Sequence, residues 1–272
     1  MNAEIICVGN ELLSGITLNT NAHWLAGQIS RAGGTVQRVT IIRDQLEAIS
    51  VGVLEAISRK PAVLIITGGL GATYDDMTLE GVAHALGKKV SLDDRAVTLL
   101  KESYSHRGLH YELTKSRLKM ATIPEGSTPL LNTIGSAPAV RLRASRTDVF
   151  CLQGVPAEMQ AAFHKYVLPM VKRSVGRFTL REAKFEVTGI TEAMLAPGLA
   201  RVVSLHSKKM IYIKTHPRGY KGKTPRLMVR IISTGANPQQ VESRLERVTK
   251  AIENETMKIG GSWAKAEGAP TT

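Results

Sequence analysis

One stretch of this chain combines glycines with paired carboxylates in a pattern suited to phosphate chemistry. It reads Thr67-Gly68-Gly69-Leu70-Gly71-Ala72-Thr73-Tyr74-Asp75-Asp76 and follows a short apolar run. Glycines let backbone N–H groups approach a phosphate without obstruction by Cβ atoms, and the start of the helix expected next favours negative charge. Two aspartates repel a phosphate unless a divalent cation bridges the carboxylate and phosphate oxygens. The sequence predicts phosphate binding at Gly68, Gly69, Gly71 and Thr73, and a metal (Mg²⁺, Mn²⁺ or Co²⁺) at Asp75 and Asp76.

The same stretch has a simpler interpretation. One of the two aspartates would cap the helix expected over about 77–86, and the glycines would then form only a tight turn. The stretch is not a Walker A loop, because it lacks Gly-Lys-Ser/Thr, and it does not match G-x-G-x-x-G. A capped turn without a ligand therefore stays open as an alternative.

Other polar side chains fall in loops that follow expected strands. Glu11 follows the first strand, and Asn19 and Asn21 flank the start of a helix, where capping explains one asparagine and leaves the other for a ligand. Asp44 alone is typical of a helix cap. Two further loops offer small polar and backbone groups, with a plain hairpin as the alternative for the first: 132–138 (Asn132, Gly135, Ser136) and 153–156 (Gly154).

Groups for nucleophilic catalysis are not apparent. Cys7 and Cys151 each lie in an apolar run, which favours buried small side chains, and no Ser/His/Asp or Cys/His arrangement stands out. The chemistry implied is metal-assisted attack on a phosphate by water or by a substrate group.

The loops belong to a regular alternation of strands and helices. Apolar runs predict strands at 4–8, 36–42 and 62–67, and helical periodicity predicts helices at 20–32 and after Asp44. This β-α-β-α-β order indicates an α/β fold with a parallel sheet. Ligands of such sheets lie beyond the carboxyl ends of the strands, so residues 9–11 should neighbour residues 67–76. Further strands are expected at 128–131, 139–143 and 149–152, and further helices at 77–86, 93–107, 113–121 and 156–171.

A second, smaller unit is expected after a stretch without apolar periodicity at 173–183. Its order is β-α-β-β-α, with strands at 184–188, 210–214 and 226–232 and helices at 191–205 and 238–255. Pro197 should interrupt the first of these helices. We expect domains at 1–172 and 184–257 and a disordered tail at 258–272.

Charge separates the two halves of the chain. Residues 1–175 carry 19 Lys/Arg against 15 Asp/Glu, a net charge of +4, whereas residues 176–272 carry 17 against 8, a net charge of +9. A basic surface attracts anions of any kind, so it is weak support for nucleic acid in particular. No apolar run reaches the roughly 20 residues of a membrane span, and no signal sequence is visible, so we expect a cytoplasmic protein.

Six motifs, in order, carry a resemblance to a known family. They are Gly9-Asn10-Glu11-Leu12-Leu13-Ser14-Gly15, Asn19-Thr20-Asn21-Ala22, the Gly-Gly-Leu-Gly-x-Thr-x-Asp-Asp-x-Thr run from Gly68 to Thr78, Ile123-Pro124-Glu125-Gly126, Asn132-x-x-Gly135-x-Ala137-Pro138 and Gly154-Val155-Pro156-x-Glu158-Met159. Together they resemble the N-terminal domain of CinA-like proteins, within the molybdopterin-binding family that includes MoaB and MogA. The resemblance spans about residues 1–172, and 184–255 is similar, more weakly, to the KH-like domain that follows in that family.

The resemblance implies a three-layer α/β/α domain, a small α+β domain and a homo-oligomer. It implies a metal-dependent pyrophosphatase acting on ADP-ribose or a related nucleotide diphosphate, with Asp75 and Asp76 as the acidic pair and Glu11 as the loop glutamate. Asn21 and Asp44 match polar positions around the pocket. CinA-like proteins also carry a nicotinamide-nucleotide amidase domain, which we expect this chain to lack.

Three positions depart from the family pattern. Asn10 stands where Thr is usual, Ala72 where Pro is usual, and Lys119 where Gln is common. The first two remove no charge, so the site should survive, and Lys119 adds a cation that could face the ligand.

Two other functions remain open. Relatives of the same fold bind or adenylylate a pterin in molybdenum-cofactor synthesis, and the shared pocket does not decide between substrates. Nucleic-acid binding through the basic second unit is the other, because Gly219-Tyr220-Lys221-Gly222 matches the G-x-x-G of RNA-binding KH domains. That motif joins helices there but falls between expected strands here, so nucleic acid is the less favoured partner.

Overall fold

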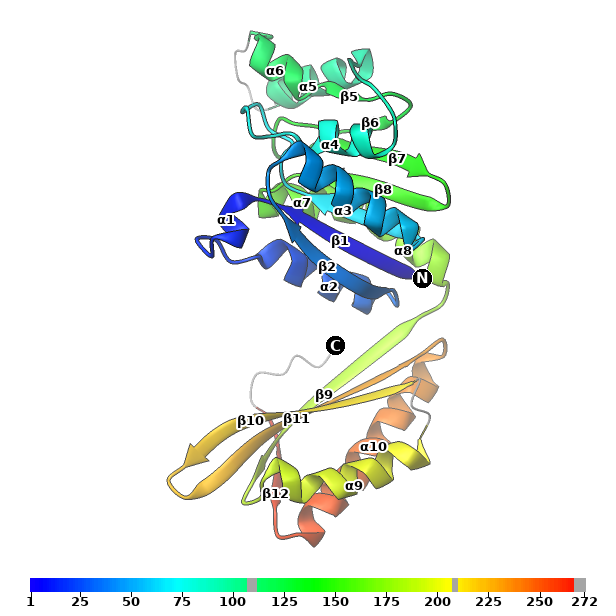
Figure 1. Ribbon diagram of the computed structural model, residues 1–272. Helices are drawn as coiled ribbons and strands as arrows, with labels where there is room; N and C mark the ends of the chain where they lie inside the picture. Colours follow the sequence, from blue (N-terminus) through cyan, green and yellow to red (C-terminus); the bar gives the residue numbers. More distant parts are fainter. Residues whose placement is uncertain (107–111, 207–209, 267–272) are drawn as a thin grey trace. The chain divides into compact units, whose positions relative to one another are not determined.

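The chain divides into two compact units, Met1–Val175 and Gly176–Thr272 (Figure 1). The computed structural model describes residues 1–106, 112–206 and 210–266. Position 107, the last residue of one expected helix, lies outside the described residues. Each unit has its own core and is considered by itself.

A six-stranded sheet forms the centre of the first unit. Its order is β2-β1-β3-β8-β7-β6, with parallel pairing from β2 to β8 and antiparallel pairing beyond. The strands are β1 (Asn2–Val8), β2 (Thr35–Ile42), β3 (Val63–Thr67), β6 (Thr128–Leu130), β7 (Ala139–Ala144) and β8 (Thr147–Leu152). The predicted parallel sheet is confirmed for four strands. β7 runs opposite to these four strands, and β6, which is antiparallel to β7, runs in their direction again.

Helices cover both faces of this sheet and make three layers (Figure 1). Successive β1 side chains alternate between two cores: Ile5 and Cys7 pack on one side, Ile6 and Val8 on the other. One face carries α3 (Leu46–Ser58), α4 (Thr78–Ala85) and α5 (Asp94–His106); the other carries α2 (Thr20–Arg31) and the continuous run of α7 (Pro156–Ala162), η1 (Phe163–Val167) and α8 (Leu168–Val175). The unit also contains α1 (Asn10–Leu13), α6 (Lys115–Lys119) and a small sheet of β4 (Val90–Leu92) and β5 (Thr122–Pro124). α1 lies inside the stretch expected to be a loop, and β4 and β5 are not predicted.

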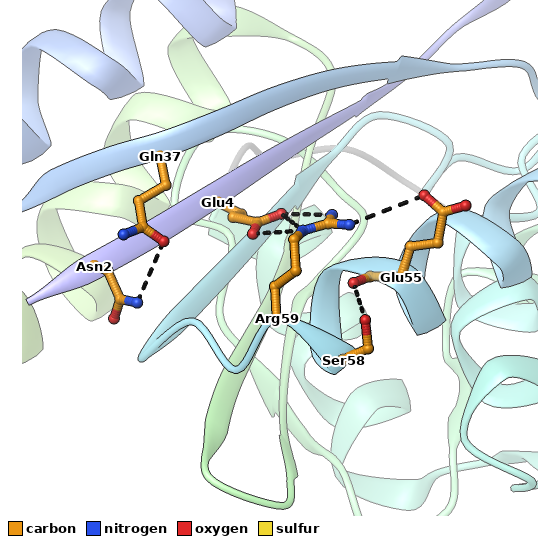
Figure 2. A network of polar contacts seen from close by, with 6 residues as sticks. All are labelled: Asn2, Glu4, Gln37, Glu55, Ser58 and Arg59. Carbon is orange, nitrogen blue, oxygen red and sulfur yellow. Dashed lines mark hydrogen bonds and ion pairs between the residues drawn. The ribbon is translucent and has the colours of Figure 1, made fainter.

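An ion pair between the exposed Arg59 and the buried Glu4 joins the end of α3 to β1 near the amino ends of the parallel strands (Figure 2). Glu4 is 2% exposed, and its carboxylate accepts hydrogen bonds from Arg59 Nε at 2.9 Å and from Arg59 Nη2 at 2.8 Å. Removing Arg59 would leave the Glu4 carboxylate buried without its partner, which is the costly way to break such a pair. The pair fixes the end of α3 at the edge of the sheet opposite to the glycine turn.

The second unit is an antiparallel sheet with two helices. The sheet order is β10-β11-β9-β12, and the helices pack on it through Leu195, Val202, Leu245 and Val248. The elements are β9 (Thr179–Thr188), α9 (Glu192–Leu205), β10 (Ile211–Lys221), β11 (Thr224–Gly235), α10 (Pro238–Lys258) and β12 (Ser262–Lys265). Among the described residues no helix combines the length and the apolar character needed to cross a bilayer.

Several expectations for this unit are wrong. β9 begins at Thr179, inside the expected linker, and α9 continues through Pro197, because Leu195 and Val202 anchor it to the sheet on both sides of the proline. The basic segment expected as a loop instead extends β10 and β11 into a long hairpin, paired out to Lys221 and Thr224.

The expected disordered tail is wrong for residues 262–265. They form β12, which pairs with β9, and the Trp263 ring stacks on Phe185 with centroids 4.5 Å apart. This pairing joins residues distant in sequence, and local composition did not indicate it. Residues 267–272 of that tail lie outside the described residues.

Candidate functional site

The carboxyl ends of three strands lie side by side. β1 pairs in parallel with β3 (Cys7 opposite Thr67), and β3 pairs with β8 (Thr67 opposite Leu152). The loops after these strands therefore leave the sheet at one edge. The prediction that residues 9–11 neighbour the glycine stretch is confirmed.

The glycine turn is shaped by the protein's own atoms. Gly68 and Gly69 have φ angles of 105° and 66°, a region that favours glycine. A Cβ on Gly68 would overlap the Val8 carbonyl oxygen, and one on Gly69 would overlap the Thr78 hydroxyl. These two glycines are therefore required by packing, whatever the turn binds.

Backbone amides in the turn remain available. Gly68 N–H donates to the Leu152 carbonyl at 3.1 Å. Within residues 1–106, 112–206 and 210–266, the structure provides no acceptor for the amides of Gly69, Leu70 and Gly71. Successive unpaired amides in a turn form an anion-binding concavity.

Thr73 holds the acidic pair. Its hydroxyl lies 2.5 Å from Asp75 Oδ1 and 2.6 Å from Asp76 Oδ2, and its N–H donates to Asp76 Oδ2 at 2.9 Å. The hydrogen bond from Thr73, with that from Asp75's own amide and the charge of Lys119, lowers the pKa of Asp75. α4 begins after Met77 without a side-chain cap, so the interpretation of either aspartate as its cap is wrong.

Lys119 reaches this loop from α6. Its Nζ donates to the Thr73 carbonyl oxygen at 2.5 Å. The structure thus brings Gly71, Thr73, Asp75, Asp76 and Lys119 together, with the Asp76 carboxylate where a Gly71 Cβ would be.

The donor set of the acidic loop fits a hard divalent cation. The hydrogen bonds from Thr73 go to Asp75 Oδ1 and Asp76 Oδ2, so Asp75 Oδ2 and Asp76 Oδ1 are not engaged by Thr73. Two carboxylate oxygens leave room for the phosphate oxygens and waters that Mg²⁺ commonly retains. The described residues contain no group of three or more His, Cys, Asp or Glu that could hold a metal, so a cation here would depend on its substrate for further ligands.

A cavity of about 110 Å³ lies at the same edge of the sheet. Asn21 helps to line it: its Nδ2 donates to the Gly154 carbonyl at 2.7 Å, while its Oδ1 is buried and has no partner among the described residues. Asn19 caps α2 by accepting from Ala22 N–H at 3.0 Å. The prediction that one of the two asparagines caps this helix is thus confirmed for Asn19. The cavity is lined by Cys7, Val8, Glu11, Leu12, Thr17, Leu18, Asn19, Thr20, Asn21, Thr67, Gly68, Gly154 and Pro156.

Glu11 and Asp44 lie near the end of β1. The Glu11 carboxylate occupies the space that a Gly9 Cβ would need. Asp44 Oδ2 accepts from Asn10 N–H at 2.6 Å, whereas α3 starts after Gln45 without a side-chain cap. The prediction of Asp44 as the cap of that helix is wrong, because its carboxylate holds the first amide of α1 instead.

Asn132 organises its own loop. Its Nδ2 donates to the Ala137 carbonyl at 3.0 Å and to Glu158 Oε2 at 2.6 Å, and its Oδ1 accepts from Gly135 N–H at 2.8 Å. The Glu158 carboxylate fills the Cβ position of Gly135, and the Ser136 carbonyl oxygen accepts from Ser103. The side chain of Asn132 is thus engaged by the protein, while ligand contact at 135–136 stays a prediction.

Sequence reasoning gave no side-chain role to two polar residues of this region, although Gln153 lies in the loop 153–156 and Glu158 in the motif that follows it. Glu158 supports the 132–138 loop. Gln153 is 3% exposed, donates to the Ala137 carbonyl at 2.8 Å, and keeps an Oε1 atom without a partner among the described residues. Its position directly after an apolar strand was the available signal. Both cysteines are buried, as predicted, and burial raises the pKa of Cys151 to about 12.

Comparison with known proteins finds relatives that match up to 96% of the chain. The model of a family described as "Probable molybdopterin binding domain" matches residues 4–173. A protein from Metallosphaera sedula is 40% identical over 260 residues, which cover 96% of each chain. One from Aeropyrum pernix is 37% identical over 260 residues, covering 96% of this chain and 95% of the relative. The crystal structure of the protein CinA, of unknown function, from Thermoplasma acidophilum is 36% identical with a TM-score of 0.58, and the match covers 62% of this chain and 97% of that chain.

Proposed function

We propose, since this chain belongs to the probable molybdopterin-binding domain family, that its first unit binds a phosphorylated nucleotide or pterin and hydrolyses ADP-ribose or a related nucleotide diphosphate. The observation that carries the proposal is the Asp75–Asp76 pair, held by Thr73 directly after a turn with unpaired amides. The similarity to CinA places the same unit in a known structural group without assigning it a reaction.

The proposed chemistry divides among a few residues. The amides of Gly69, Leu70 and Gly71 would bind phosphate oxygens, and the carboxylates of Asp75 and Asp76 would hold Mg²⁺, Mn²⁺ or Co²⁺. When bound, such a cation neutralises phosphate charge and lowers the pKa of water. The lowered pKa of Asp75 keeps its carboxylate ionised.

The reaction adds one water across the diphosphate. The water oxygen forms a bond to one phosphorus, the bridging P–O bond breaks, and ADP-ribose yields AMP and ribose 5-phosphate. Glu11, one of the residues that line the cavity, is the proposed acceptor of the water's proton. Asn21 would offer its unpaired Oδ1 to a hydroxyl or N–H group of the substrate.

A pterin is the second candidate ligand. The description of the matching family favours it, because that description names molybdopterin. In that case the glycine turn and the metal would bind the phosphate of a pterin, and no diphosphate would be hydrolysed.

The decisive experiment measures AMP release from ADP-ribose with Mg²⁺, Mn²⁺ or Co²⁺. We expect Asp75→Asn and Asp76→Asn each to lower kcat/KM about 100-fold or more, since each removes a charged ligand but keeps a hydrogen-bond acceptor. Asp94→Asn, on the exposed start of α5, is the matched control and should leave turnover unchanged.

Two results would count against hydrolysis. One is the absence of AMP with all three metals. The other is equal turnover in the Asp75→Asn, Asp76→Asn and Asp94→Asn proteins. Fluorescence titration with a pterin phosphate then tests the second ligand on the same variants.

A further inference from the structure

The sheet of the second unit has one covered face and one open face. Figure 1 shows α9 and α10 on the same side of this sheet. Along β11, Leu227, Val229 and Ile231 are buried toward the helices, so Met228 and Arg230, which alternate with them, belong to the other face. Neither helix of this unit covers that face, which we call the open face.

Positive charge gathers on one side of the open face. Between positions 193 and 241 the chain has nine Lys/Arg and no Asp/Glu, and five of the nine lie on β10 and β11: Lys214, Arg218, Lys221, Arg226 and Arg230. On β9 the open face carries Glu182 and Glu186, which pair with Arg230 and Arg226 of β11. β10 contributes no acid, so its side of the face is left with uncompensated cations.

Three cations stand in one row across the strands. The pairing register places Lys214 of β10 opposite Arg230 of β11, and Arg230 opposite Lys184 of β9. Like charges directly opposite one another destabilise a sheet. Glu182 compensates Arg230 and Lys184 through ion pairs of 2.8 and 3.1 Å, whereas Lys214 has no ion-pair partner among the described residues.

Two aromatic side chains, Tyr212 and His216, flank Lys214 on β10. Tyr212 and His216 lie two residues before and after Lys214, on the same face, and all three are exposed; Tyr212 is 56% exposed. β10 is also the edge strand of the sheet. Rings that alternate with cations are the surface on which single-stranded nucleic acids stack their bases and place their phosphates.

We propose that the β10 side of the open face binds single-stranded nucleic acid, with Lys214 on a phosphate and Tyr212 under a base. This site is separate from Gly219-Tyr220-Lys221-Gly222, which lies at the tip of the β10–β11 hairpin rather than between helices. It is also independent of the chemistry proposed for the first unit. An acidic peptide or an anionic membrane would use the cations but has no need of the exposed ring.

The test uses the full chain and a fluorescently labelled 20-nucleotide oligouridine, with anisotropy followed at increasing salt. Lys214→Gln should weaken binding and reduce the slope of log K against log salt by about 0.7, the value for one phosphate contact. Arg247→Gln, an equal loss of charge on α10, is the control and should leave both unchanged. Tyr212→Ala should weaken binding at least about fivefold, and Tyr212→Phe should restore it, because stacking needs the ring and not the hydroxyl.

Other outcomes overturn the proposal. These are no binding of the oligomer at low salt, equal effects of Lys214→Gln and Arg247→Gln, or unchanged affinity in Tyr212→Ala. Heparin, or vesicles rich in anionic lipid, could bind as tightly as the oligomer. If that binding is also unchanged in Tyr212→Ala, the face is a general polyanion surface and not a nucleic-acid site. Circular dichroism of each variant separates loss of binding from loss of folding.

Discussion

At the scale of residues, the glycine turn serves packing and leaves its amides to a ligand. Gly68 brings its backbone against the Val8 carbonyl, and Gly154 lies against Gly68 from the neighbouring loop. Asn21 ties the same loop to α2 through the Gly154 carbonyl. The turn is thus held from several sides before any phosphate binds.

Replacing Gly68 by alanine should be far more costly than replacing Gly87. Both have positive φ, but a Cβ on Gly87 meets nothing within 4 Å, whereas one on Gly68 overlaps backbone. We expect Gly87→Ala to lower the free energy of unfolding by about 1–2 kcal/mol, from backbone strain alone. Gly68→Ala should cost at least about 2 kcal/mol more. Urea denaturation measures both, and equal losses would show that the overlap is relieved without cost.

Thr73→Val should raise the pKa of Asp75 toward its ordinary value. In the wild type the hydrogen bond from Thr73 lowers this pKa, so its stabilisation is present above the unfolded-state pKa and is lost as pH falls through the folded-state pKa. Carboxyl NMR titration of Asp75 checks the shift. Thr98→Val is the control, because it removes a hydroxyl that donates to the backbone carbonyl of Asp94, away from this loop. If the pKa of Asp75 is the same in Thr73→Val as in the wild type, the hydrogen bond from Thr73 is not what lowers it.

At the scale of elements, short segments complete structures that begin far away in the sequence. β12 adds a fourth strand to the sheet through β9, and α6 brings Lys119 to the loop after β3. β12 has no strong pattern of its own, and α6 lies within the helix predicted at 113–121 but is only five residues long. Their structure depends on the surfaces that receive them.

Trp263→Ala tests this dependence for β12. The Trp263 ring is half-buried and stacked on Phe185, so its loss should lower the free energy of unfolding of the second unit by about 1–3 kcal/mol. Met257→Ala, 60% exposed near the end of α10, should have little effect. If urea denaturation gives the same midpoint for both variants, β12 contributes no stability.

At the scale of the whole molecule, the chain consists of two units with separate cores. The apolar clusters of Met1–Val175 and of Gly176–Thr272 share no residue. The candidate hydrolytic site uses only residues of the first unit, and the proposed nucleic-acid surface only residues of the second. The expected homo-oligomer stays a prediction that sedimentation velocity can test.

The fragment Met1–Val175 should therefore fold and retain ADP-ribose turnover. Its core and every proposed site residue lie within its bounds. Circular dichroism and AMP release, compared with the full chain at equal concentration, provide the measurement. A folded fragment without turnover, beside an active full chain, would show that the second unit contributes to catalysis.

The sequence alone determined the alternation of strands and helices around the central sheet of the first unit, and it placed the candidate site after the strands of that sheet. Buried parallel strands appear in the sequence as continuous apolar runs, and ligands of such sheets bind at the loops that follow them. The glycines and acids of Gly68–Asp76 lie within one such loop, so the sequence alone was sufficient to predict a site there. The same local reasoning predicted that one of Asn19 and Asn21 caps the helix, and the structure assigns the cap to Asn19.

Only the tertiary structure decided how individual polar groups are used. Asp44 bonds to Asn10, and Asn21 bonds to Gly154, across separations of 34 and 133 residues. Such pairings depend on which strands become neighbours, and therefore a local sequence pattern cannot predict them. The row of cations on the open face of the second unit is also decided by tertiary structure, because Lys214 and Arg230 lie opposite each other only once β10 and β11 pair.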